Sequence, residues 1–281
     1  MTFALERPGT VAEALRLLGD RTVGPAVPLA GGTDLLLDVD DGRLAPRTVV
    51  SLARLPWRTM RWDGTALVVG ATLPLARLAA DPSARARLPG LVDAVDAVGS
   101  LALRHRATLG GNLGRASPAS DLIPILLATG AVVRVASLAG PREVPIGQFV
   151  RGSRATALGP GELIESVAIP AAPRSSYVWQ RVRPANDVSQ VGVAVAWTGT
   201  PGAWQVALGG VLPAPIRVVE AEAVLRGERP TAAEVELASQ AAATRAPFVT
   251  DRRATESYRR RLVSTLVRRG IARALTPAEG R

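Results

Sequence analysis

The spacing of apolar residues along the chain alternates between a helical period and a strand-like period. Near the N-terminus, apolar side chains share one face of a predicted helix, namely Val11, Ala12, Leu15 and Leu18. Thr10 and Glu13 form a capping box at its start, and Gly19 ends it. Further on, apolar runs predict strands at 48–52, 66–69 and 131–135 and helices at 91–98 and 122–128.

The last third of the chain follows a segment rich in proline and small residues, 170–176, which is typical of a linker between domains. Beyond this linker, the pattern predicts an antiparallel sheet and several helices, with strands at 177–183, 191–197 and 204–208 and helices near 217–226, 232–245 and 255–275. We therefore expect an α+β protein in three parts, 1–55, 56–172 and 173–281, with a three-stranded sheet in the last part.

Two glycine-rich segments carry the candidate chemistry, 30–34 (Ala-Gly-Gly-Thr-Asp) and 108–112 (Thr-Leu-Gly-Gly-Asn). Backbone N–H groups of small residues can approach a ligand closely, as a diphosphate requires, and two such segments suggest a diphosphate held from both sides. An ordinary strand–turn–helix connection explains the first segment equally well. After the second segment, Ser120 or Asp121 can cap a helix. Neither segment is a Rossmann fingerprint, and a P-loop needs a lysine, which the chain lacks.

The composition excludes several kinds of site. The 281 residues include no cysteine, so this chain alone cannot form a disulfide, a thiol nucleophile, an iron–sulfur cluster or a thiolate metal site. A single histidine, His105, rules out a histidine-rich metal site. We therefore predict neither a metal site nor a catalytic side chain. The sequence shows no apolar run long enough to span a membrane and no signal-peptide pattern, so we expect a cytoplasmic protein.

The net charge of +10 raises the question of nucleic-acid binding. All the cationic side chains are arginines that are spread through every third of the chain, and only 4% of the residues are aromatic. A nucleic-acid surface would concentrate the charge and add aromatic rings for base stacking. We therefore expect no nucleic acid as partner. The densest group of arginines lies at 252–269, where a polar helix face explains it better than a docking surface.

Motifs along nearly the whole chain resemble those of the FAD-binding medium subunits of molybdenum hydroxylases, the family of the carbon monoxide dehydrogenase and xanthine dehydrogenase flavoprotein subunits. They include both glycine-rich segments and the run Ser-Pro-Ala-Ser-Asp-Leu at 117–122. The other shared positions are 69–72, 106–107, 156–158, 161–163, Asn186, Asp187, 208–211, Pro213, Pro215, Arg217 and 251–269.

The resemblance implies a set of FAD contacts, which are Ala30, Gly31, Gly32, Thr33, Asp34, Thr108, Leu109, Gly110, Gly111, Asn112, Ser120 and Asp121. The chain departs from the family at Ala107, where glycine is common, and near Gln180, where the family has a lysine. Arg181 or Arg183 is a candidate replacement for that lysine, although arginine is not equivalent to it. His105 lies beside the second glycine-rich segment, either as a polar loop residue or as a flavin contact.

The resemblance also implies a fold and a function. The fold would be a two-subdomain FAD-binding domain of the PCMH type over 1–55 and 56–172, followed by a C-terminal antiparallel sheet with helices. In this family a large molybdopterin subunit hydroxylates the substrate and a small subunit with two [2Fe–2S] clusters carries the electrons. The FAD subunit passes them to NAD⁺, oxygen or a quinone. We therefore expect an oxidoreductase subunit within a hetero-oligomer, with the substrate left open.

Three other functions are considered. The first is a stand-alone FAD-dependent oxidoreductase of the same fold, which co-purification with partner chains would exclude. The second is a binding or structural protein that has lost FAD, against which the retained Thr33, Asp34, Asn112 and Asp121 argue. The third is an arginine-rich nucleic-acid binder, which predicts a steep salt dependence of binding.

Overall fold

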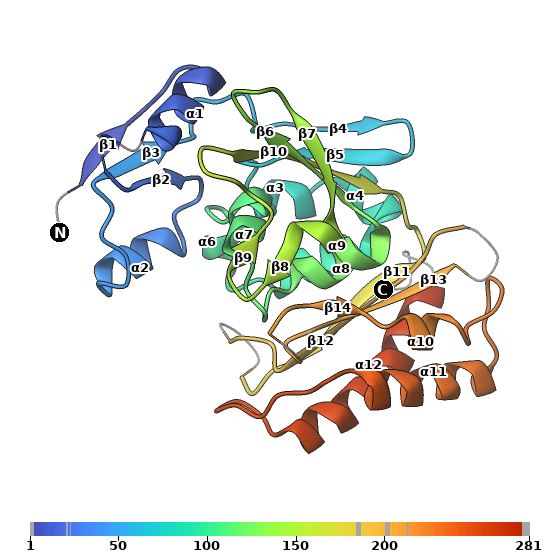
Figure 1. Cartoon of the computed structure of the whole chain (residues 1–281). Helices are drawn as coiled ribbons and strands as arrows, with labels where there is room; N and C mark the ends of the chain where they lie inside the picture. The colour runs from blue at the N-terminus through green and yellow to red at the C-terminus, as the bar shows by residue number, and fades with distance from the viewer. Residues whose placement is uncertain are drawn as a thin grey trace.

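The computed structural model describes residues 3–276 except 21, 23, 184–186, 200–202 and 212. Three main β-sheets succeed one another along the described chain, and a two-stranded ribbon accompanies them (Figure 1). The first sheet lies at the N-terminal end, the second occupies the centre, and the third packs below the second, with two long helices on its far side. The shared motif residue Asn186 lies outside the described residues. This mixed architecture confirms the predicted α+β class.

The first sheet is parallel, in the order β1-β3-β2, with β1 at Ala4–Glu6, β2 at Ala26–Leu29 and β3 at Thr48–Ser51. Helices α1 (Val11–Gly19) and α2 (Leu35–Asp40) connect its strands. Thr10 Oγ1 accepts a 3.2 Å hydrogen bond from the Glu13 N–H, as the sequence predicts. The Glu13 carboxylate accepts from the Gly9 N–H at 2.9 Å and not from Thr10, so the reciprocal half of the capping box is shifted by one residue.

The second sheet is antiparallel, in the order β4-β5-β10-β6-β7. These strands span Met60–Asp63, Ala66–Gly70, Leu163–Pro170, Val132–Ala136 and Arg142–Pro145, respectively. Val69, Val167 and Val133 are paired in register across its three central strands, and all three are fully buried. This row anchors the largest apolar core, which the helices beside the sheet complete.

Most of the helices that follow β5 pack on this core. They are α3 (Leu75–Ala79), α4 (Pro82–Arg87), α5 (Pro89–Ala97), α7 (Leu109–Arg115), α8 (Leu122–Thr129) and α9 (Ile146–Phe149). The short helix α6 (Leu101–Arg104) lies between α5 and α7 in the chain and contributes no buried side chain. All eight residues of α8 are buried, because the helix lies between the second and third sheets. A two-stranded ribbon, β8 (Val150–Gly152) with β9 (Ala155–Thr156), precedes β10.

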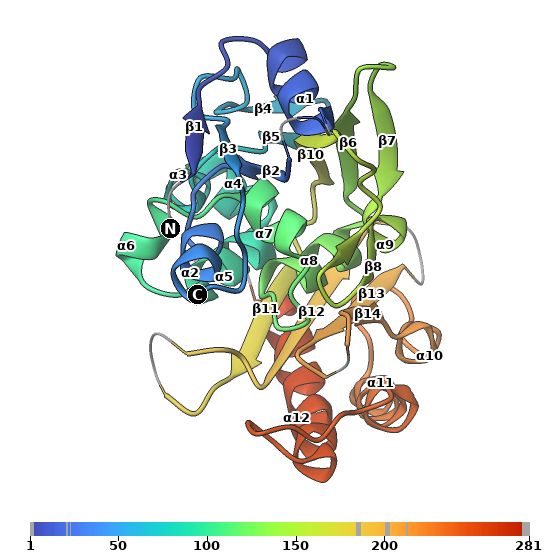
Figure 2. The same ribbon diagram turned by 60° about the vertical axis from the view of Figure 1, so that its left-hand side comes forward.

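The third sheet has the order β11-β12-β13-β14, with strands at Ser175–Gln180, Val191–Trp197, Trp204–Gly209 and Ile216–Arg217. The central strand β12 is buried on both faces. Ala194 and Ala196 belong to the core shared with α8, whereas Val193 and Val195 face a second core. That second core is closed by α10 (Val219–Glu222), α11 (Ala232–Arg245) and α12 (Glu256–Leu275), of which α11 and α12 cover the outer face of the sheet (Figure 2).

Two sequence expectations about the third sheet are wrong. The sheet has four strands and not three, because Ile216 and Arg217 pair with Leu208 and Ala207 at its edge. The helix expected near 217–226 is correspondingly shorter, Val219–Glu222. A two-residue strand carries too few positions to show an alternating pattern, so the sequence could not reveal it. The division of the chain at 55/56 and 172/173 stays a prediction.

Two structural features are absent from the described residues. Within this part of the chain, no helix combines the length and the apolar character needed to cross a membrane. Nor do the described residues include a group of three or more histidine, cysteine, aspartate or glutamate side chains that could hold a metal ion.

Candidate functional site

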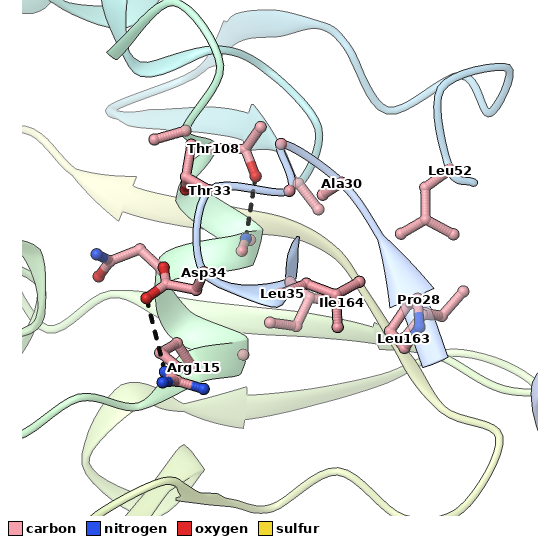
Figure 3. Close-up of a pocket in the computed structure, with 18 of the residues that line it drawn as sticks. Pro28, Ala30, Thr33, Asp34, Leu35, Leu52, Thr108, Arg115, Leu163 and Ile164 are labelled. Carbon is pink, nitrogen blue, oxygen red and sulfur yellow. Dashed lines mark hydrogen bonds and ion pairs between the residues drawn. The ribbon is translucent and has the colours of Figure 1, made fainter. Parts of the chain in front are cut away.

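The two glycine-rich segments meet at a cavity of about 320 Å³ between the first and second sheets (Figure 3). At the point of contact, a Cβ atom on Gly31 would overlap the carbonyl oxygen of Arg106 and lie 3.1 Å from the Cα of Ala107. Glycine is therefore required at position 31 for the two segments to approach this closely. The cavity volume lies at the low end of ligand sites, roughly 300–1,000 Å³, which fits part of a large ligand.

The first segment connects β2 to α2, and its backbone N–H groups face the cavity without a hydrogen-bond acceptor among the described residues. Among the hydrogen bonds of the described residues, none is donated by the backbone N–H groups of residues 31–34, although all four residues line the cavity. Gly32 has a φ of +80°, a conformation that glycine adopts without strain. Unpaired N–H groups at a cavity wall are donors for an anionic group such as a diphosphate.

The second segment uses its amide groups differently from the first. Thr108 caps α7 by accepting a 3.0 Å hydrogen bond from the Gly111 N–H at Oγ1, and its carbonyl accepts from Asn112. The Gly110 N–H donates to the carbonyl of Ala71 at 3.1 Å. The expectation that this segment offers free N–H groups does not hold for 110–112, since the contact with Ala71 uses that of Gly110 and the start of α7 uses those of Gly111 and Asn112. It contributes the exposed surface of Gly111 and the side chain of Asn112 to the cavity wall.

Three of the expected contact residues do not line this cavity, namely Leu109, Ser120 and Asp121. Leu109 is fully buried in the main core. Ser120 contacts a residue of the cavity wall, because its hydroxyl donates a 2.5 Å hydrogen bond to Oδ1 of Asn112, which lines the cavity. Ser120 Oγ also accepts from the N–H groups of Leu122 and Ile123 at 3.2 and 3.3 Å, so it caps α8 as one of the two predicted candidates.

Asp121 occupies the N-cap position of α8 without a side-chain capping bond. Its Oδ1 instead accepts hydrogen bonds from the Tyr177 hydroxyl at 2.7 Å and the Ser189 hydroxyl at 2.6 Å, both from the third sheet region. Burial raises the pKa of this carboxyl group, and the bonds from Ser189 and Tyr177 oppose that shift. Asp121 therefore joins the α8 end of the central core to the third sheet.

The two arginines proposed as replacements for the family lysine, Arg181 and Arg183, differ in their surroundings. The guanidinium group of Arg181 is almost fully buried; it donates to the carbonyl of Ala97 and lies 3.6 Å from Oδ2 of Asp121. Ala97 precedes Val98, which lines the cavity. Arg183 is 70% exposed and pairs with Asp187, so it does not reach this network. Of the two candidate replacements, Arg181 is the one held beside Asp121.

Arg115 was not expected from the sequence, yet it is central to the cavity's electrostatics. Of the described residues that line the cavity, Arg115 alone carries a positive charge. Its guanidinium group bonds the carboxylate of Asp38 and lies 3.6 Å from Oδ1 of Asp34. The hydrogen bond from Arg115 is the main cause that lowers the pKa of Asp38. No sequence spacing signals a pair 77 residues apart, although a nearby cation relieves the repulsion between two aspartates one helical turn apart.

His105 lies at the C-cap of α6 and is exposed, and it does not line the cavity. This position agrees with a polar loop residue, and the flavin contact stays the untested alternative.

The cavity wall combines donors for an anion with apolar surface for a ring. Its apolar part comes from several elements and includes Pro28, Leu35, Leu52, Val98, Leu163 and Ile164. The unpaired N–H groups of 31–34 and the charge of Arg115 fit a diphosphate, and the apolar wall fits an adjoining aromatic ring. The residues present therefore fit a dinucleotide cofactor that brings its own chemistry.

Comparisons with known proteins agree with this geometry. Residues 1–172 match the family described as FAD binding domain in molybdopterin dehydrogenase, and residues 176–274 match the CO dehydrogenase flavoprotein C-terminal domain. The chain is 30% identical to the nicotine 6-hydroxylase medium subunit of Paenarthrobacter nicotinovorans, over 95% of each chain. It is 28% identical to a putative xanthine dehydrogenase FAD-binding subunit of Escherichia coli K12, over 98% of this chain and 97% of that one.

Solved structures show the same fold. Carbon monoxide dehydrogenase from Hydrogenophaga pseudoflava superposes with a TM-score of 0.89 at 28% identity, covering 98% of this chain and 97% of that chain. Quinoline 2-oxidoreductase from Pseudomonas putida 86 superposes with a TM-score of 0.90 at 26% identity, covering 100% and 98%.

Proposed function

The chain belongs to the family of FAD-binding domains of molybdopterin dehydrogenases and is an oxidoreductase flavoprotein subunit that binds FAD, and on this premise we propose that it is the electron exit of a larger enzyme. In this role it receives electrons from [2Fe–2S] clusters on a partner subunit and delivers them to an external acceptor. FAD, when bound, would accept electrons one at a time from the clusters and could pass them on one at a time or as a pair.

The observation that carries the FAD site is the set of unpaired N–H groups at 31–34 beside Arg115. These N–H groups are the donors for the diphosphate, which needs hydrogen bonds in a cavity that the carboxylates of Asp34, Asp38 and Glu162 also line. Arg115 itself is paired with Asp38 and Asp34. Gly111 and Asn112 form the facing wall, and Ser120 holds the Asn112 amide in place. We extend the proposed contacts to the rest of 30–34 and 108–112. The contact expected at Asp121 stays a prediction that a variant can test.

The need for partner chains follows from what the sequence lacks. Without cysteine, the chain cannot ligate the clusters that feed electrons to a flavin in such enzymes, so a small [2Fe–2S] subunit has to supply them. A large molybdopterin subunit then has to bind and oxidise the substrate. Relatives named as medium chains or medium subunits support this assembly. The acceptor is NAD⁺, oxygen or a quinone.

The test compares the isolated chain with the complex. After FAD is supplied, the purified chain is expected to show flavin absorbance bands, which for protein-bound oxidised flavin lie near about 375 and 450 nm. Candidate substrates should reduce this flavin in the complex reconstituted with cluster-bearing and molybdenum-bearing partners, and not in the isolated chain. Absence of the bands would overturn the FAD site. Substrate-dependent reduction of the flavin in the isolated chain would instead establish the alternative, a stand-alone FAD-dependent oxidoreductase.

A further inference from the structure

The first sheet and its helices are joined to the rest of the molecule at separate points of the cavity wall. A small apolar core crosses from Leu15 and Leu52 to Ala136 and Leu163 of the second sheet. Gly31 makes the backbone contact with Arg106 described above. Arg115 of α7 makes the third link, through ion pairs with Asp34 and Asp38 at the two ends of the first turn of α2. Figure 3 shows the pair with Asp34.

Helix α2 has little intrinsic stability. It spans six residues, and Asp34 at its N-cap makes no side-chain capping bond. Leu36 and Leu37 are 45% and 59% exposed, so they contribute little buried area. A helix of this length is unstable in water without tertiary contacts, because nucleation is costly and few internal bonds form. The position of α2, and with it the end of the first glycine-rich segment, therefore depends on its buried residues Asp38 and Val39.

The carboxylate of Asp38 is the critical group among these contacts. Its side chain is 9% exposed and is bonded by two arginines, Arg43 with Nε at 2.9 Å and Arg115 through both Nη atoms. A carboxylate removed from water has to be paired with charge. Arg43 follows α2 in the same part of the chain, whereas Arg115 comes from the opposite wall of the cavity. Arg115 is thus the partner that ties Asp38 across the cavity.

We propose that Arg115 is a positioning residue for FAD, which acts by holding α2 through Asp38 and Asp34. This bridge, the ion pairs of Arg115 with Asp38 and Asp34, keeps the N–H groups of 31–34 opposite Gly111 and Asn112. Both walls of the cavity then contact the cofactor at the same time. Release of FAD then requires this bridge to open. The inference rests on the proposed FAD site and adds a residue that controls how long the cofactor stays.

The first experiment measures the rate of FAD dissociation from the full chain, together with thermal stability, in three variants. Arg115→Met is expected to release FAD about tenfold faster than wild type, which corresponds to about 1.4 kcal/mol. Arg115→Lys should recover part of this loss, because it keeps the charge without the bidentate geometry. Arg217→Met is the matched control, since Arg217 bonds the 9% exposed Glu222 at 2.9 and 2.5 Å in the C-terminal region.

The control variant is expected to lose stability without any change in FAD dissociation. An unchanged dissociation rate in Arg115→Met would overturn the inference while leaving the FAD site intact. If wild-type protein takes up no FAD, the proposed function fails, and the second experiment still decides about the bridge.

That experiment measures amide hydrogen exchange over 36–41 in the cofactor-free chain. Arg115→Met and Asp38→Asn should each accelerate exchange in this segment, and the double variant should show less than the sum of the two effects, because the two side chains share one contact. Unchanged exchange in both single variants, or fully additive effects, would contradict the bridge.

Discussion

The hydroxyl group of Tyr177 donates a 2.7 Å hydrogen bond to Oδ1 of Asp121, and this bond joins the third sheet to the start of α8. Both residues are buried, Tyr177 to within 1% of its surface. The hydroxyl reaches Asp121 because Gly192 on the neighbouring strand leaves room for it; a Cβ atom there would overlap the ring. A buried polar contact therefore lies within the apolar core that α8 shares with the third sheet, and the loss of one partner would leave the other unpaired.

Replacing Asp121 with alanine should destabilise this interface. The variant leaves the hydroxyl groups of Tyr177 and Ser189 without their acceptor, so we expect the free energy of unfolding to fall by about 1–3 kcal/mol. Tyr177→Phe removes one donor and should cost about 1 kcal/mol. Chemical denaturation measures both values. FAD affinity determined on the same variants completes the test: a loss of affinity in Asp121→Ala that Tyr177→Phe does not share would show that Asp121 contacts the flavin directly.

Neighbouring glycines in α7 should respond differently to substitution. In Gly110→Ala the new Cβ would lie 2.6 Å from Cβ of Ala71, so overpacking should lower the free energy of unfolding by about 1–3 kcal/mol. At Gly111 the nearest atom to a new Cβ is Thr108 Oγ1 at 3.0 Å, and the residue is exposed at the cavity. Gly111→Val should therefore keep its stability within about 1 kcal/mol and lose FAD. The flavin content of the purified variant tests the predicted loss of FAD. If Gly111→Val retained as much flavin as the wild type, FAD would not bind against Gly111.

Acid should weaken the bridge at Asp38. Its folded-state pKa is lowered, chiefly by the hydrogen bond from Arg115, so its contribution to stability is fully present above the ordinary value of 3.8 and is lost as the pH falls through the folded value. Asp38→Asn lacks this titration. The difference in melting temperature between wild type and Asp38→Asn should therefore be constant above pH 3.8 and shrink below it. A difference that grows with acid would refute the assignment.

A buried arginine on α12 should matter more for stability than its exposed neighbour. The guanidinium group of Arg259 donates to the carbonyl oxygens of Gln190 and Gly210, at adjoining ends of β12 and β13, and to Asp251 at 2.5 Å. Arg259→Met leaves these acceptors unpaired and should cost about 2–3 kcal/mol, the range for charged hydrogen bonds. Arg261→Met, on the exposed side of the same helix, should change stability by about 0.5 kcal/mol or less. Equal effects in urea denaturation would contradict this role.

The sequence alone was sufficient for features that depend on local pattern. The apolar periodicity located six of the described helices and six of the described strands, since neighbouring residues determine which face of an element is buried. It missed β10, the central strand of the second sheet. The glycine-rich segments at 30–34 and 108–112 predicted the two sides of the cavity, because close backbone approach requires glycine wherever it occurs. The motifs also predicted the family and FAD, which the comparisons confirm.

Only the tertiary structure decided which side chains meet. The pair of Arg115 and Asp38 is separated by 77 residues, and no local pattern encodes that distance. The same holds for Asp121, for which the sequence left open a helix cap or a ligand contact, whereas in the structure its carboxylate bonds Tyr177. Where a side chain could bond several partners, the packing of whole helices and strands determines which partner lies within bonding distance. Here α8 and β11 bring Tyr177 to Asp121, while Ser120 provides the cap.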